Sequence, residues 1–131
     1  MFTHDDILMP LAVTVIIDTK VRDMEIAEFC RQAQGLIDLI DLKPMSTAEL
    51  QKWFAAHRDQ IAEKLSGARR NTLVLRVLSK FKDDVLMENL YDAMVQISVC
   101  DQEYRQEESD LIKSAAVLWG YERPPIKIIR G

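Results

Sequence analysis

Two pairs of carboxylates recur at the same spacing in distant parts of the chain. In VIIDTKVRDMEIAEF, Asp18 is followed at the seventh step by Glu25, and in SVCDQEYRQEESDLI, Asp101 is followed at the seventh step by Glu108. Carboxylate oxygens are the ligands that hard divalent cations prefer. All four residues are therefore candidate ligands of Ca²⁺ or Mg²⁺, with turn carbonyls and water completing each shell.

The residues between the paired carboxylates also match. An offset of 83 residues aligns Val21 with Tyr104 and Arg22 with Arg105. Each copy falls where one apolar periodic segment ends and the next begins, which indicates a helix–turn–helix junction. The pattern predicts an internal duplication of a helical hairpin, with two halves packed about a pseudo-twofold axis.

A second interpretation gives the same carboxylates a structural role. Glu25 and Glu108 would stabilise helix N-termini through the helix dipole, while Asp18 and Asp101 would accept hydrogen bonds from turn amides. The neighbouring arginines would then neutralise the charge that a metal would otherwise neutralise. The sequence favours this structural role, and the metal site stays as the alternative.

The elements that position these junctions are all predicted to be helices. Apolar residues recur at spacings of three and four along most of the chain, which is the period of amphipathic helices. The predicted helices cover about 6–18, 22–41, 46–66, 68–81, 84–100 and 105–119. We therefore expect a single-domain all-α bundle of six or seven helices over residues 1–121, followed by a C-terminal tail, 122–131.

Several local signals refine these helices. Ser46-Thr47-Ala48-Glu49 has the form of a capping box at a helix start, and Gly67 is expected to end that helix in a left-handed conformation. Pro10 is compatible with a helix only in its opening turn. On the helix between the repeats, Phe54 is predicted to be core and Trp53 peripheral, and the pair is predicted to join the two halves.

The second junction and its surroundings resemble a known family. ISVCDQEYRQEESDLIKSAAVLWGYE is similar to part of the TerB-like domain, the family of the tellurite-resistance TerB proteins and of the N-terminal region of DjlA-type co-chaperones. That family carries roughly Ala-Asp-Gly-x-Ile-x-x-x-Glu twice, whereas this chain has Thr19 and Gln102 in place of the glycines. The resemblance implies an all-helical interaction or regulatory module in stress response, and it also implies divalent metal binding.

A row of cations marks a candidate interaction surface. Arg69, Arg76 and Lys80 are separated by seven and four residues, which places them on one face of a predicted helix. Such a row suits an acidic protein partner or an anionic membrane surface, although most such rows are simply solvated. Nucleic acid is disfavoured, because the net charge is −4 and no aromatic residue between the cations could stack on bases.

Catalytic signatures are missing from the sequence. It contains no Gly-rich phosphate loop, nucleophile elbow or HExxH motif, and neither His4 nor His57 has a Cys or carboxylate at metal-ligand spacing. Cys30 and Cys100 lie within apolar periodicity, as reduced core cysteines do. We expect a cytoplasmic, non-enzymatic protein that acts through protein partners.

Overall fold

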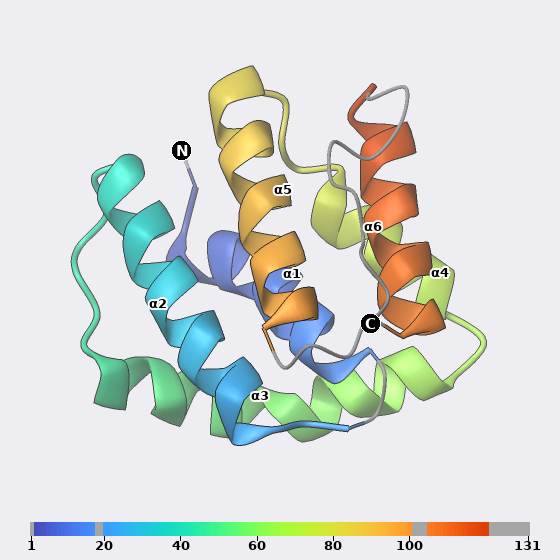
Figure 1. Cartoon of the computed structure of the whole chain (residues 1–131), viewed down its shortest axis with the longest axis horizontal. Helices are drawn as coiled ribbons and strands as arrows, with labels where there is room; N and C mark the ends of the chain where they lie inside the picture. The colour runs from blue at the N-terminus through green and yellow to red at the C-terminus, as the bar shows by residue number, and fades with distance from the viewer. Residues whose placement is uncertain (1, 18–19, 101–104, 121–131) are drawn as a thin grey trace.

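The computed structural model describes residues 2–17, 20–100 and 105–120. Within these ranges the chain forms six α-helices and no strand, which confirms the predicted all-α class (Figure 1). The helices are α1 (His4–Ile16), α2 (Asp23–Leu39), α3 (Thr47–Ser66), α4 (Arg70–Leu78), α5 (Asp84–Val99) and α6 (Gln106–Leu118). The tail and residues 18–19 and 101–104 of the repeated junctions lie outside the described residues, and with them Asp18, Thr19, Asp101, Gln102 and Tyr104.

Helix α1 forms the centre of the bundle. It packs against α2, α3, α4 and α5, and side chains on all of its faces are buried from Ile7 onwards, as expected for a helix that is apolar all round. Helices α2 and α5 pack side by side on α1, α3 crosses along one edge of the bundle, and α6 packs on α5 and α4 (Figure 1). None of the described helices is long and apolar enough to cross a membrane.

The position of Pro10 in α1 differs from the prediction. The helix begins at His4, so Pro10 is its seventh residue and lies beyond the opening turn. A capping box starts the helix early: the Asp6 amide donates to Thr3 Oγ1 over 3.2 Å, and the Thr3 amide donates to Asp6 Oδ2 over 3.0 Å. The helix persists through Pro10 because burial of its apolar faces outweighs the one backbone hydrogen bond that proline removes.

The boundaries of α3 confirm one prediction and correct another. The Glu49 amide donates to Ser46 Oγ over 3.1 Å, and the Ser46 amide donates to Glu49 Oε1 over 3.0 Å. These bonds form the predicted capping box, and the bond from the Ser46 amide lowers the pKa of Glu49. The predicted left-handed end at Gly67 is wrong, because Gly67 is extended (φ −98°, ψ −178°) and leads directly into α4. Among the described glycines, the left-handed one is Gly120, at φ 82°, after α6.

The aromatic pair on α3 takes the predicted burial. Phe54 is buried, with its ring centroid 5.3 Å from that of Phe29 on α2. Trp53 is half-buried, stacks at 6.2 Å from Phe29, and donates from Nε1 to Asp5 Oδ1 over 2.9 Å. These contacts attach α3 to α1 and α2. The prediction that the pair joins the two hairpins therefore gains no support from them.

Candidate functional site

Glu25 lies at the third position of α2, where the helix exposes its first amides. The side chain is completely buried, and its Oε1 accepts a hydrogen bond of 3.2 Å from the Arg22 amide. The Arg22 guanidinium Nη1 lies 3.8 Å from the same oxygen. A carboxylate in this position offsets the partial positive charge of the helix N-terminus.

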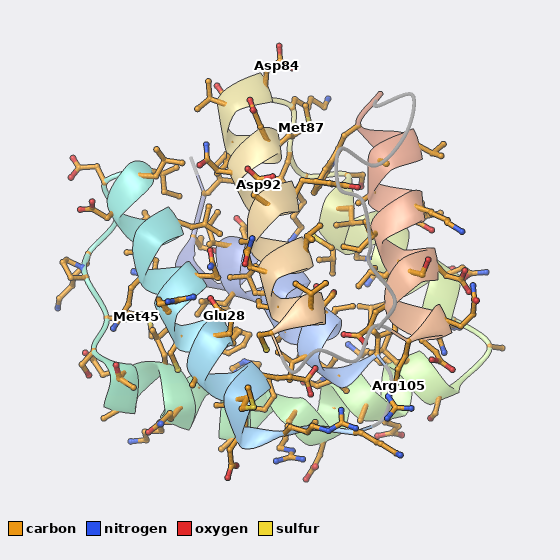
Figure 2. The ribbon with its side chains drawn as sticks, in the orientation of Figure 1. Glu28, Met45, Asp84, Met87, Asp92 and Arg105 are labelled. Carbon is orange, nitrogen blue, oxygen red and sulfur yellow. The ribbon has the colours of Figure 1, made fainter. Side chains whose placement is uncertain are left out.

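Glu108 repeats this arrangement at the third position of α6. It is 1% exposed, and its Oε1 accepts a 3.2 Å hydrogen bond from the Arg105 amide. Figure 2 labels Arg105 at the beginning of α6. Both arginines are extended N-cap residues, at φ −114°, ψ 152° and φ −92°, ψ 163°. Arginine has no acceptor atom, so each junction forms only the carboxylate half of a capping box.

Of the two carboxylates that the metal interpretation requires at each junction, only the glutamate is among the described residues. Asp18 and Asp101, the partners that it requires, lie outside them. Ca²⁺ takes about six to eight oxygen ligands, yet one oxygen of each glutamate already accepts from a backbone amide. No group of three or more His, Cys, Asp or Glu residues in the described ranges could hold a metal ion. The visible geometry suits the structural role of these carboxylates.

The predicted cation row is divided by the end of its helix. Only Arg76 lies inside α4, whereas Arg69 is its N-cap and Lys80 follows its C-terminus. All three are exposed. Lys80 Nζ lies 3.0 Å from Asp6 Oδ1 of α1 and forms an ion pair with that carboxylate. The row is therefore less uniform than a single helical face would be.

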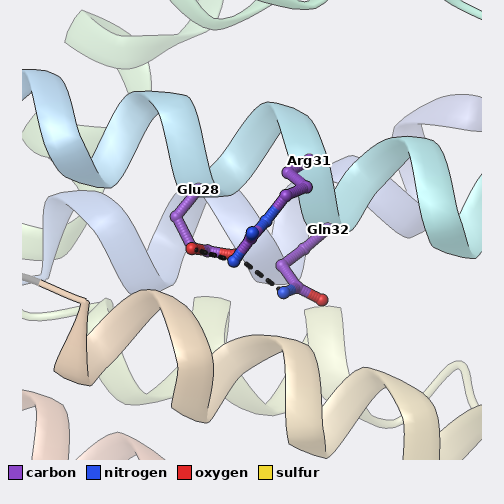
Figure 3. A network of polar contacts seen from close by, with 3 residues as sticks. All are labelled: Glu28, Arg31 and Gln32. Carbon is purple, nitrogen blue, oxygen red and sulfur yellow. Dashed lines mark hydrogen bonds and ion pairs between the residues drawn. The ribbon is translucent and has the colours of Figure 1, made fainter.

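A polar cluster on α2 is also an intrahelical arrangement. Arg31 Nη2 lies 2.6 Å from Glu28 Oε1, and Gln32 Nε2 donates to Glu28 Oε2 over 2.7 Å (Figure 3). The bond to Glu28 raises the pKa of the Arg31 guanidinium. Residues three and four apart on a helix commonly pair in this way. This cluster therefore stabilises the surface of α2 and does not indicate a ligand.

A groove that the sequence did not predict follows one face of α3. It consists of two adjoining pockets with volumes of about 180 and 310 Å³. The first, here called the junction pocket, is lined by Ile16, Ile17, Val21, Arg58, Asp59, Ala62, Leu65, Ser66 and Arg70. The second, the outer pocket, is lined by Asp23, Ile26, Ala27, Gln51, Phe54, Ala55 and Arg58. Together they form the α3 groove.

The α3 groove runs along almost the whole of its helix. The lining positions on α3 recur every three or four residues from Gln51 to Ser66, so they occupy one helical face. With a rise of about 1.5 Å per residue, this face is about 22 Å long. Its opposite wall comes from the first helix junction, through Ile17, Val21 and Asp23.

Arg58 lies at the centre of the groove and lines both pockets. Its guanidinium carbon is 5.8 Å from the ring centroid of Phe54, within the range of a cation–π contact. Arg70 contributes a second cation to the junction pocket, where Asp59 is the one carboxylate among the lining residues. The sequence carried no signal that separates this site: Ala55 and Ala62 line the groove, whereas Ala56, also exposed on the same helix, does not.

We found no significant match to any protein-family model, to any curated protein or to any solved structure.

Proposed function

We propose that this chain is a non-catalytic, TerB-like interaction module that binds a protein partner in the α3 groove. The observation that carries the proposal is a continuous lining face of about 22 Å on one helix, opposed by a second wall from α2 and the first junction. Grooves between helices commonly accept an amphipathic helix, which seats apolar anchors at helical spacing. A face of this length matches about four turns of such a helix.

The size of the junction pocket favours a side chain of a partner over a small-molecule ligand. Ligand pockets usually enclose about 300–1,000 Å³, whereas the junction pocket encloses about 180 Å³. A cavity of about 150 Å³ accepts one benzene ring. The junction pocket therefore has room for one aromatic or branched side chain, and the outer pocket, at about 310 Å³, for a second with part of its backbone.

The helix boundaries support the duplicated hairpin within this proposal. The ends of α1 and α5, at Ile16 and Val99, differ by 83 residues, and so do the starts of α2 and α6, at Asp23 and Gln106. That is the offset which aligns the two sequence clusters. In the proposed module, the repeated glutamate caps fix the two hairpins, and partner binding belongs to the groove beside the first one.

The proposal can be tested by filling the groove. Ala62→Phe and Ala55→Phe each place a ring in one pocket, because both alanines are exposed lining residues. Ala56→Phe is the matched control, since Ala56 is exposed on the same helix but lines neither pocket. Wild type and control should enrich the same helical peptides from a random displayed library. Both groove variants should lose them while keeping the wild-type thermal midpoint.

Two outcomes would contradict the proposal. One is that no peptide is enriched by the wild type. The other is that the enriched peptides bind the groove-filled variants as tightly as the Ala56→Phe control, which would place their site elsewhere on the surface.

A further inference from the structure

We infer that the α3 groove recognises an acidic amphipathic helix in which one carboxylate lies between two large apolar anchors. The inference rests on the proposed function and specifies its partner. It follows from three features of the groove: a shared arginine, an excess of cations at the junction pocket, and two apolar floors separated by about two helical turns.

The shared arginine supplies the central contact. Arg58 lines both pockets, so a ligand that fills both must pass its guanidinium. The Phe54 ring beneath it, 5.8 Å away, favours a guanidinium that lies over the groove floor. A planar guanidinium binds a carboxylate with two parallel hydrogen bonds, which combines charge with directionality. The side chain opposite Arg58 should therefore be Asp or Glu.

The charges around the two pockets select the same chemistry. Among the described residues, the junction pocket is lined by two cations, Arg58 and Arg70, and by one carboxylate, Asp59. These described lining residues carry an excess of positive charge in a chain of net charge −4. The outer pocket carries Asp23 in addition to Arg58. An acidic residue is therefore favoured near the junction pocket and disfavoured at the outer end, where Asp23 would repel it.

The floors of the pockets set the spacing of the anchors. Ile17, Val21 and Leu65 line the junction pocket, and Ile26 and Phe54 line the outer one. The α3 positions of the two pockets are centred about seven residues apart, or about 10 Å along the helix axis. A partner helix lying along α3 would fill both pockets with apolar residues at i and i+7, and would place the carboxylate at i+3 or i+4 opposite Arg58.

The experiment first determines the sequences of the peptides that the wild type selects, and then measures their binding to a variant in which the charge at position 58 is reversed. Peptides enriched by the wild type should carry large apolar residues at i and i+7 with Asp or Glu between them. Their affinity, measured by fluorescence polarisation, should fall at least about tenfold for Arg58→Glu, because a charge-assisted hydrogen bond is lost. Lys52→Glu is the matched control, since Lys52 is an exposed cation of α3 outside both pockets. A peptide with Lys in place of its acid should recover affinity for Arg58→Glu.

The outcomes separate this inference from the proposed function. Two results would overturn the acidic partner and leave the groove as a binding site. One is that peptides lost with Ala62→Phe lack an acidic residue. The other is that the peptides bind Arg58→Glu as tightly as they bind Lys52→Glu. Peptides indifferent to Ala62→Phe would overturn both. Acid-dependent binding with charge-swap rescue would support both.

Discussion

Glu25 at the α1–α2 junction and Glu108 at the α5–α6 junction each accept a 3.2 Å hydrogen bond from the amide of an arginine N-cap. The first junction lies beside the groove that it forms with α3. The second leads into α6, which packs against α5 and α4. Both glutamates are buried, and both follow an extended arginine N-cap. The described parts of the two junctions thus share one capping geometry. What differs is the helix that lies beside each one.

This difference separates a folding device from a binding surface. A carboxylate at the third position of a helix accepts from the free amides of the helix N-terminus and interacts favourably with the helix dipole. At the second hairpin, Trp119 extends towards α4, where its Nε1 donates to Leu78 O over 3.1 Å and its ring packs edge-on against Phe81. A pocket of about 460 Å³ lies beside these two rings, at the far end of α6, and no residue of the α5–α6 junction is among its described lining residues. At the first hairpin, α3 leaves two pockets open beside the junction. The repeated caps therefore belong to the folding of the two hairpins, whereas the candidate binding site depends on α3, which lies beside the first junction only.

The largest expected effect comes from removing the packing beneath the first junction. Phe54 is buried against Phe29 and lines the outer pocket, so Phe54→Ala should lower the free energy of unfolding by about 3 kcal/mol or more. Urea denaturation followed by circular dichroism would measure this loss. A loss below about 1 kcal/mol would show that α3 contributes little to the first hairpin. The two junctions would then no longer differ through the packing of α3 beside the first one.

Neutralising the two caps should have smaller and equal effects. Glu25→Gln and Glu108→Gln keep the oxygen that accepts from the arginine amide but remove the charge at the helix N-terminus. Each should lower the free energy of unfolding by about 0.5–2 kcal/mol. Equal losses, within about 0.5 kcal/mol, would sharpen the claim that the junctions share one device. A large loss at one junction beside a negligible loss at the other would break it.

The caps were predictable from sequence because capping is local. An apolar period that restarts just before Glu25 and Glu108 is enough to locate a helix start, and the same logic located the Ser46 box. The groove was not predictable, because Arg58 lines two pockets only when residues far away in sequence become its opposite wall. Gly67 was misassigned for a related reason: the path of the chain into α4 overrides the usual conformation of a terminal glycine.

A third prediction concerns the charge at the start of α1. The pKa of Asp6 is lowered, first by the hydrogen bond from the Thr3 amide and further by Lys80, with burial opposing both. A depressed folded pKa stabilises the protein above the unfolded value of about 3.9, and this stability is lost as the pH falls through the folded pKa. Asp6→Asn should therefore cost about 0.3–1 kcal/mol at pH 7. Chemical denaturation at a series of pH values should show that this difference narrows below about pH 4, and a constant difference would contradict the assignment.

The second hairpin should respond to pH with the opposite sign. Burial and the neighbouring Glu88 raise the pKa of Asp92 on α5; Figure 2 labels Asp92 on that helix. A raised carboxyl pKa means that the folded state binds the proton more tightly, so the ionised group costs stability at neutral pH and the cost is relieved as the pH falls through the raised pKa. Asp92→Asn should stabilise the protein by about 0.2–0.5 kcal/mol at pH 7, because it removes a solvent-screened like-charge pair four residues apart. Destabilisation by this substitution would assign Asp92 a favourable partner instead.

The smallest expected effect is the response of the two junctions to divalent ions, and it decides between the two roles of the repeated carboxylates. An ion that binds only the folded state raises stability by RT ln(1 + [L]/Kd), which is about 2.7 kcal/mol at a concentration one hundredfold above Kd. We expect no such shift with millimolar Ca²⁺ or Mg²⁺, because Oε1 of Glu25 and of Glu108 already accepts from a backbone amide inside the fold. Thermal melts of wild type, Glu25→Gln and Glu108→Gln, with each ion and with a chelator, would measure it. A saturable rise that disappears only in Glu108→Gln would assign an ion site to the second junction, and one that is reduced, but not abolished, in each variant would assign a site to each junction. Only the second result would make the shared capping geometry a repeated metal site, and the first junction would then combine ion binding with the groove beside it.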